Sequence, residues 1–448
     1  METRNASHEG SHTMANYPVL LVHGYSDDGR SFAKWGERLR AAGHDARAVR
    51  VATWRSLANE VSLTDVAEAF ERALAEEPGL GADEPFSVVV HSTGSLVVRA
   101  WLAADPTRRR RLVHLIGLAP ANFGSPLAHK GRSFLGMLAK GNKKFGEDFM
   151  EVGDRVLDAL ELGSRFTWDL AHRDLLSADG GWYGNGVSAP WAFTVCGTGE
   201  FSWPQRLFVD PPGSDGVVRW TGSALDVRKL TVDLSRRADE RLTVSGERPL
   251  DVPLAFVADR HHGAMRDRPT GNLEKMVLEA LAVRVPADDR TWREKWSAKD
   301  RPKEAWQQFV VHVRDERGDG VSDYNVQFDV TWDSGEKETL VDFASDVHPY
   351  KRDTSYRAFH VKLKDVKRSR IASLRLKIIA RTNTSHVGYR GAGGDRVDGW
   401  DGALDVSAFG PKGEVKLFWP FTTTLIEIVL DREPRPYTGA NEVLWFAK

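Results

Sequence analysis

The stretch Phe86–Ala100 constrains this chain most, because it changes from a strand pattern to a helix pattern around one serine. The β-branched run Val88–Val90 leads into His-Ser-Thr-Gly, and helix-forming residues follow. This pattern predicts a strand, a sharp turn and a helix, with Ser92 at the apex. A serine hydroxyl is a weak nucleophile until a base takes its proton, and a tight turn holds its oxygen towards such a base. Gly94 lets the chain turn back without a clash from a Cβ atom.

The match to the nucleophile motif G-x-S-x-G is incomplete, because Val90 occupies the first glycine position. A side chain there crowds the strand against the following helix. We therefore expect a slightly splayed elbow or a displaced helix. Taken alone, the stretch fits an ordinary strand-to-helix loop equally well, so the rest of the chain has to decide.

Short apolar runs alternate with amphipathic helical patterns over the first 285 residues. This alternation predicts a mostly parallel sheet flanked by helices, in which ligands bind at the carboxyl ends of the strands. Both Ser92 and His23 come at such ends. The predicted strands are 17–22, 46–51, the run 88–90, 112–118, 191–197 and 254–258, and the predicted helices are 31–42, 63–76, 94–103 and 272–283.

The chain is predicted to contain a tag or disordered leader (1–14), a catalytic domain (15–285), a linker (286–301) and a second domain (302–448). The insertion at about 127–181 is helical and aromatic-rich, and we interpret it as a lid over the site. Extra scaffold helices are the alternative. The last domain is predicted to be an all-β sandwich, because runs that alternate like antiparallel strands recur between Gly/Asp turns. These runs are 309–313, 325–331, 356–363, 373–380, 414–418 and 424–430.

Composition narrows the functional classes. The chain has 448 residues and a formal net charge of -1, so no global field attracts nucleic acid. The arginine run 108–111 has no stacking aromatic residues near it and fits a solvated connection. We predict no metal site, no cofactor and no nucleic-acid partner. The absence of a signal peptide favours the cytoplasm, and secretion stays open if a signal has been removed.

Ser92, Asp215 and His262 follow one another in the order serine, acid, histidine, each near a predicted strand end. In the roles that this order suggests, the serine attacks an ester, the histidine transfers its proton and the aspartate orients the imidazole. The developing oxyanion needs backbone N–H donors, for which Thr93 and Tyr25 are placed correctly.

Five motifs together resemble bacterial lipases and lecithin:cholesterol acyltransferase-like lipases of the α/β-hydrolase superfamily. The resemblance covers about residues 17–283 and leaves the C-terminal part uncovered. It implies an α/β-hydrolase fold, with the acid in D-G-x-V and the histidine three residues before a methionine. The motifs are V-L-L-V-H-G-Y, V-H-S-T-G-S, L-A-P-A-N-F-G-S-P-L-A, S-D-G-V-V and H-H-G-A-M.

Alternatives remain at several positions. His261 is a rival to His262 as the base, and Asp226 or Asp259 could replace Asp215 as the acid. The residues His23, His91 and Phe123 are candidates for substrate binding, and the two histidines have the alternative role of fixing loops around the serine.

The predicted function is therefore that of a serine ester hydrolase, a lipase or carboxylesterase that forms an acyl-enzyme. Its expected partner is a lipid or another acyl ester. Phospholipids are a further substrate class, since the β-sandwich could contact a membrane surface. An acyltransferase on the same triad and a non-catalytic binding protein with this fold are the alternatives.

Overall fold

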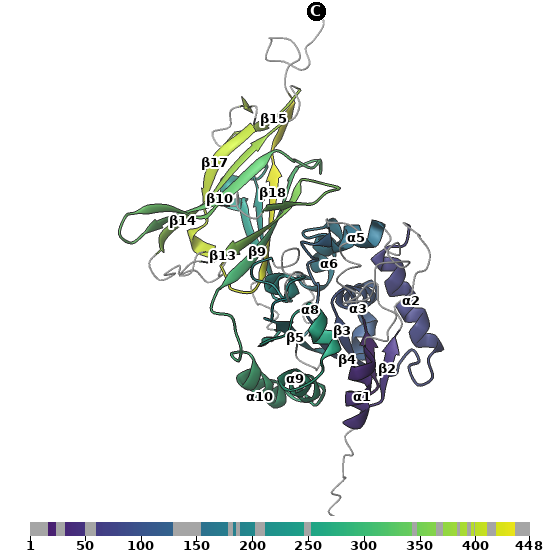
Figure 1. The fold of residues 1–448 in the computed structure, drawn as a ribbon. Coiled ribbons are helices and arrows are strands. Elements are labelled where there is room, and N and C mark those ends of the chain that lie inside the picture. The colour runs from purple at the N-terminus through teal and green to yellow at the C-terminus, as the bar shows by residue number, and fades with distance from the viewer. Residues whose placement is uncertain are drawn as a thin grey trace, which may run out of the picture.

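The computed structural model contains an α/β domain and a β domain that lie against each other (Figure 1). Among the described helices, none has the length and apolar character needed to cross a membrane. The structure describes residues 17–23, 32–49, 60–128, 154–177, 182–184, 189–201, 211–245, 252–342, 347–363, 371–382, 386–391, 396–397, 399–409 and 418–434.

A six-stranded sheet forms the centre of the α/β domain. Its strand order is β2-β1-β3-β4-β5-β8, and all neighbouring strands are parallel. Each strand corresponds to one of the predicted apolar runs, which confirms the predicted parallel sheet. The strands are β1 (Val19–Val22), β2 (Ala46–Val49), β3 (Phe86–His91), β4 (Leu112–Leu118), β5 (Trp191–Gly197) and β8 (Leu254–Val257).

Different helices cover the two faces of this sheet. They are α1 (Ala33–Ala41), α2 (Leu63–Glu76), α3 (Gly94–Ala104), α8 (His262–Asp267), α9 (Asn272–Leu281) and α10 (Pro286–Trp296). Along β3, Val88 and Val90 lie in an apolar cluster with residues of α2 and α3. Between them, Val89 points to the other face and lies in a cluster with residues of α1, α9 and α10. Both faces of β3 are therefore buried, as expected for a strand inside a parallel sheet.

Two packed sheets form the β domain, which matches the predicted sandwich. The larger has the order β12-β13-β9-β18-β6-β7 and the smaller β11-β10-β14-β17, while β16-β15-β19 form a short third sheet. Phe309 and Ile426 of the larger sheet share one apolar cluster with Phe328 and Leu376 of the smaller sheet. The strands are β6 (Val227–Asp233), β7 (Leu242–Ser245), β9 (Trp306–Asp315), β10 (Tyr324–Trp332), β11 (Lys337–Asp342), β12 (Val347–Pro349), β13 (Tyr356–Lys362), β14 (Ile371–Arg381), β15 (Val387–Arg390), β16 (Arg396–Val397), β17 (Gly399–Asp405), β18 (Thr423–Leu430) and β19 (Arg432–Pro434).

The direction of β18 differs from the prediction of antiparallel strands throughout this domain. It pairs in parallel with β9 on one side and with β6 on the other. Both of its faces are buried, since Ile426 lies in the sandwich core and Leu425 lies in the core shared with the α/β domain. A strand buried on both faces carries no polar alternation that would reveal its partner or its direction.

The predicted domain boundary at 286–301 is crossed by strand pairing. The strands β6 and β7 lie within the predicted catalytic domain, 15–285, but they complete the larger sheet of the β domain through the β6–β18 pair. The chain therefore enters the β domain, returns to the α/β domain at β8 and enters the β domain again at β9. Neither β6 nor β7 is among the predicted strands, and the pairing of β6 with β18 depends on contacts distant in sequence.

The segment predicted as a linker is largely a helix of the α/β domain. Within it, α10 buries Trp292 and Trp296 against the sheet. The Trp292 indole N–H donates to the Met276 carbonyl at 3.0 Å, and its ring lies 4.7 Å from that of Phe193. The prediction was wrong because Trp292 and Trp296 lie four residues apart on one buried face of a helix, and the many charged residues between and around them resemble a linker.

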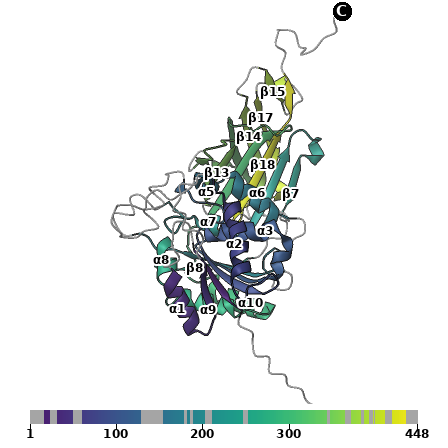
Figure 2. The same ribbon diagram turned by 90° about the vertical axis from the view of Figure 1, so that its right-hand side faces the viewer.

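The described part of the predicted lid joins the two domains. It contains α5 (Asp154–Leu160) and α6 (Arg165–Asp174), while 129–153 lies outside the described residues. Following α5, the Glu161 carboxylate accepts a hydrogen bond from the backbone N–H of Lys351 at 2.9 Å and lies 3.1 Å from Nε2 of His348. Figure 2 shows α5 and α6 between the α/β domain and β13. This segment is therefore part of the junction between the domains.

Acid is expected to destabilise the fold through His114 on β4. Burial, with a contribution from Arg284, lowers the pKa of this histidine to about 4. In the folded state Nδ1 lies 2.8 Å from Ser87 Oγ and Nε2 2.8 Å from the Val283 carbonyl. Below pH 6.5 the unfolded chain therefore binds a proton that the folded chain does not bind. The contribution of His114 alone should lower the free energy of unfolding by about 1.4 kcal/mol per pH unit between pH 6.5 and 4.

Thermal unfolding between pH 7 and pH 4.5 checks this expectation. The decrease in Tm should be shallower for His114→Gln than for the parent chain. The variant His386→Gln, at an exposed position, serves as the control and should follow the parent. Equal slopes for all three chains would contradict a role for His114.

Candidate active site

Ser92 lies in a strained turn between β3 and α3. Its φ is 54°, in the left-handed region that serine rarely adopts. Two backbone hydrogen bonds of Ser92 connect the turn to the last residue of β4 and to the loop that follows β4. The Ser92 N–H donates to the Leu118 carbonyl at 3.2 Å, and the Ser92 carbonyl accepts from the Ala121 N–H at 3.1 Å. Strain of this kind persists only where surrounding structure enforces it, and it is typical of a nucleophile elbow.

The helix α3 begins unusually close to the end of β1. A Cβ atom on Gly94 would lie 2.5 Å from the Val22 carbonyl oxygen and 2.9 Å from that of His23. Only glycine fits this approach, and so the glycine two residues after the serine is the one that the elbow requires. The first motif glycine is replaced by Val90, which is buried in the core facing α2 and α3.

Gly94→Ala is expected to lower kcat/KM for ester hydrolysis by about 100-fold, because a shift of about 1 Å at the reacting atoms has this effect. Steady-state turnover and Tm measure the result. Gly81→Ala is the matched control, since a Cβ atom there meets nothing within 4 Å. Parent-like activity in Gly94→Ala would show that the close approach is not needed.

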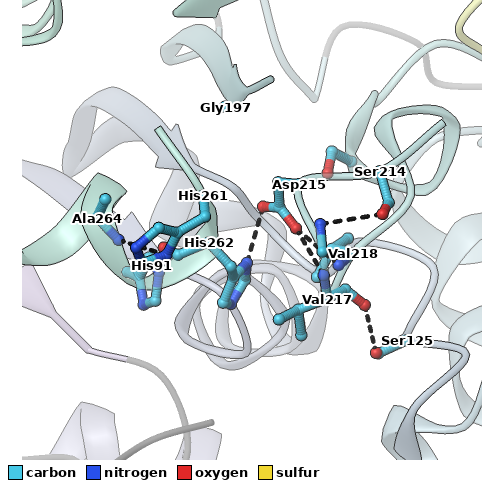
Figure 3. Close-up of polar contacts among 12 residues, drawn as sticks. His91, Ser125, Gly197, Ser214, Asp215, Val217, Val218, His261, His262 and Ala264 are labelled. Atoms are coloured by element: carbon cyan, nitrogen blue, oxygen red, sulfur yellow. Dashed lines mark hydrogen bonds and ion pairs between the residues drawn. The ribbon is translucent and has the colours of Figure 1, made fainter. Parts of the chain in front are cut away.

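Asp215 lies in a loop after β5 and bonds His262, the first residue of α8 (Figure 3). His262 Nδ1 lies 2.8 Å from Asp215 Oδ2, and the His262 backbone N–H donates to the Asp215 carbonyl at 3.0 Å. The other carboxylate oxygen accepts from the N–H groups of Val217 and Val218, at 3.0 and 2.8 Å. Because a carboxylate can only accept, Nδ1 carries the proton. The unprotonated nitrogen of a neutral His262 is then Nε2, the atom that a base needs.

The residue before the serine supports His262. His91 is buried, and its Nε2–H donates to the His262 carbonyl at 3.1 Å. The two rings lie 4.7 Å apart. Burial, followed by the nearby charges of His262 and Arg266, lowers the pKa of His91 well below its usual value. His91 is therefore neutral near pH 7 and links the end of β3 to the start of α8.

The rival histidine occupies a different position. His261 precedes α8, and its Nδ1 accepts from the Ala264 N–H at 3.3 Å, so the ring caps the helix. Its ring also lies 4.4 Å from that of Phe201. Asp259 lies in the left-handed region at φ 58°, and the Asp226 carbonyl accepts from the Thr423 N–H. Of the three candidate acids, Asp215 is the one whose carboxylate bonds His262.

One predicted oxyanion donor can be placed. Thr93 is buried and occupies the N-cap of α3, directly after Ser92. The first N–H groups of a helix have no partner within it and carry partial positive charge, which suits a developing oxyanion. Tyr25, the second predicted donor, lies outside the described residues, and its role stays a prediction.

The two remaining candidates for substrate binding are buried. His23 and Phe123 are only 1% exposed, at the end of β1 and in the loop after β4. The Phe123 N–H donates to the Gly222 carbonyl at 2.9 Å, which connects that loop to the segment after Asp215. Phe123 therefore connects two segments of the α/β domain, and direct contact of either residue with a substrate stays a prediction.

A buried ion pair that the sequence analysis missed holds the loop after β4. Arg99 of α3 and Asp174 of α6 are fully buried, with Nε and Oδ2 2.8 Å apart. Arg99 also donates to the Asn122 carbonyl at 2.8 Å, and the Tyr183 hydroxyl donates to Asp174 at 2.8 Å. The sequence contains one sign of this ion pair. Arg99 stands inside the otherwise apolar run of α3, and a buried charge needs a partner.

Comparison with solved structures shows the fold of the whole chain. Phospholipase PlaB from Legionella pneumophila matches over 96% of this chain and 97% of its own, at 20% identity and a TM-score of 0.72. Its complex with thio-NAD gives a TM-score of 0.70 at the same identity and coverage. The likeness spans both domains, so the arrangement of an α/β-hydrolase fold with a β domain is common to the two proteins.

A second similar structure is the mature form of lipase BlEst2 from Bacillus licheniformis. It is 14% identical, covers 59% of this chain and 92% of its own, and has a TM-score of 0.39. No protein-family model matches the sequence, and no curated protein matches it either.

Proposed function

We propose that this protein is a serine ester hydrolase that cleaves acyl esters through an acyl-enzyme on Ser92. The observation that carries the proposal is the hydrogen bond between Asp215 and His262 beside the strained turn at Ser92. Nucleophile, base and orienting acid would thereby come from three segments that follow the parallel strands β3, β8 and β5, at the edge where this fold places its chemistry.

In the first half of the reaction, Nε2 of His262 takes the proton from Ser92 Oγ as that oxygen bonds the ester carbonyl carbon. The carbonyl oxygen becomes an oxyanion, which the Thr93 N–H stabilises together with Tyr25. The imidazolium that forms lies against the Asp215 carboxylate. It then gives its proton to the leaving alcohol as the carbon–oxygen bond of the ester breaks, and the acyl group stays on Ser92.

In the second half, water replaces the alcohol. His262 takes a proton from the water, whose oxygen bonds the acyl carbon, and a second oxyanion forms at the same position. Its collapse breaks the bond to Ser92 Oγ, which recovers the proton from His262, and the free acid leaves. The same groups serve twice, so no additional catalyst is needed.

We further propose that the substrate is a lipid ester, with membrane phospholipids as the first class to test. Support comes from the aromatic-rich insertion at 127–181 and from the likeness to a phospholipase along the full length of both chains. A phospholipid substrate requires contact with a membrane surface, and the β domain is the part of the chain proposed to make it.

The test of the proposed reaction is covalent labelling with an alkyl fluorophosphonate. We expect the probe to attach to the peptide that contains Ser92 and to abolish turnover of p-nitrophenyl esters. A chain-length series of these esters and vesicles of mixed phospholipids then identify the acyl preference and the lipid class from the fatty acid released. Added alcohols separate hydrolysis from acyl transfer, because a transferase yields a new ester.

The absence of labelling, together with ester turnover at the background rate, would reject the hydrolase proposal and favour a binding protein with this fold. Turnover of short esters without release of fatty acid from vesicles would retain the hydrolase and reject phospholipids as its substrate.

A further inference from the structure

The segment that carries Asp215, residues 211–219, is folded on itself into a compact loop, here called the acid loop. The Asp215 N–H donates to the Val218 carbonyl at 3.2 Å, and the Gly216 N–H donates to Ser214 Oγ at 3.0 Å. The Gly213 carbonyl accepts from the Trp220 N–H at 3.0 Å. Internal bonds of this kind fix the shape of the loop, whereas its position depends on what it rests against.

One face of the acid loop rests on two stacked rings of the β domain. Trp306 of β9 and His360 of β13 lie 4.6 Å apart with an angle of 6° between their planes. A Cβ atom on Gly213 would lie 2.8 Å from Trp306 Cγ and 2.8 Å from His360 Cε1. The backbone of the acid loop, two residues before Asp215, therefore touches both rings directly.

The chain after the acid loop is also attached to the β domain. The Thr423 hydroxyl of β18 donates to the Thr221 carbonyl at 3.1 Å. Immediately afterwards, β6 pairs in parallel with β18 from Val227 onwards. The acid loop is thus supported by the β domain through the stacked rings at its start and through a strand pair beyond its end.

We propose that Trp306 and His360 are positioning residues for the Asp215–His262 pair, so that the β domain is a structural part of the catalytic site. The proposal deepens the proposed function and rests on it. Asp215 bonds His262 through both its carboxylate and its backbone carbonyl, so a displaced acid loop also displaces the base. Neither ring takes part in the chemistry itself; each determines where the acid lies.

The decisive variants are Trp306→Leu and His360→Leu, which remove the stack one ring at a time. We expect each to lower kcat for a soluble short-chain ester by about tenfold or more, with KM within about twofold, because misplaced groups weaken the chemical step rather than binding. The pH profile of kcat should change as well, because His262 transfers the protons of the reaction and Asp215 holds it in place. Trp306→Phe keeps an aromatic face and should restore most of the activity.

Trp400→Leu is the matched control. Trp400 is buried in the sandwich core, on β17 of the smaller sheet, so its loss should lower Tm without changing kcat or the pH profile. Equal loss of kcat in Trp306→Leu and Trp400→Leu would reduce the effect to general destabilisation and overturn the proposal. Unchanged kcat in folded Trp306→Leu and His360→Leu would overturn it too.

Hydrogen exchange separates this proposal from the proposed reaction. The Val217 and Val218 amides are bonded to Asp215 Oδ1, so exchange in a peptide that covers the acid loop reports its order without any substrate. Exchange should be faster in Trp306→Leu and unchanged in Trp400→Leu. If the parent chain lacks esterase activity but these exchange differences appear, only the reaction is rejected. If the parent is active and exchange is unchanged in Trp306→Leu, only the positioning role is rejected.

Discussion

If the proposed reaction is correct, replacing Ser92 with alanine is expected to lower kcat for ester hydrolysis by about 10⁶-fold, the loss found when the triad serine of a serine protease is removed. The reason is that no other group in the described site offers an activated oxygen to the ester carbonyl. The change removes one oxygen atom, and alanine then adopts the same backbone conformation, with φ near 54°, that serine adopts. We therefore expect little change in Tm and a loss confined to chemistry.

Steady-state turnover at high enzyme concentration, with mass spectrometry after fluorophosphonate treatment, measures this effect. Ser235→Ala, at an exposed turn after β6, is the control and should retain parent activity and labelling. Turnover in Ser92→Ala within about tenfold of the parent would place the nucleophile elsewhere. A variant that has lost labelling but keeps its Tm would separate the loss of the nucleophile from unfolding.

The sequence allowed the candidate site to be predicted because its members follow local patterns that can be recognised without knowledge of the fold. Ser92 follows the buried run that forms β3, and His262 follows the run that forms β8 after a short loop. Parallel strands bring their carboxyl ends to one edge of a sheet, so residues far apart in sequence could be expected to meet. The choice between His261 and His262 required coordinates, because neighbouring residues share the same local pattern.

Long-range pairing explains what the sequence could not reveal. The segment Val227–Asp233 is not among the predicted strands, and its partner β18 begins almost 200 residues later, at Thr423. The stacked pair beneath the acid loop was equally hidden. Trp306 and His360 are distant in sequence and meet only because β9 pairs with β13, and the contact of Gly213 with both rings follows from that pairing.

The two adjacent histidines provide the sharpest test of the assignment within the site. His262→Ala is expected to lower kcat by about 10⁶-fold, a loss comparable with that of the nucleophile itself, since the two groups act as one unit. Without the imidazole, Ser92 keeps its proton and the leaving alcohol receives none. The double variant Ser92→Ala/His262→Ala should therefore be hardly less active than either single variant, which a cycle of kcat values measures.

His261→Ala is the matched comparison, with the same atoms removed one residue away. His261 caps α8 through the Ala264 N–H, and loss of a helix cap costs about 1 kcal/mol of stability. We expect a lower Tm and a decrease in kcat of about tenfold or less, because the bond between His262 and Asp215 does not pass through His261. The reverse result, with the large loss in His261→Ala, would require the two loops to rearrange before catalysis. It would transfer the role of base to His261.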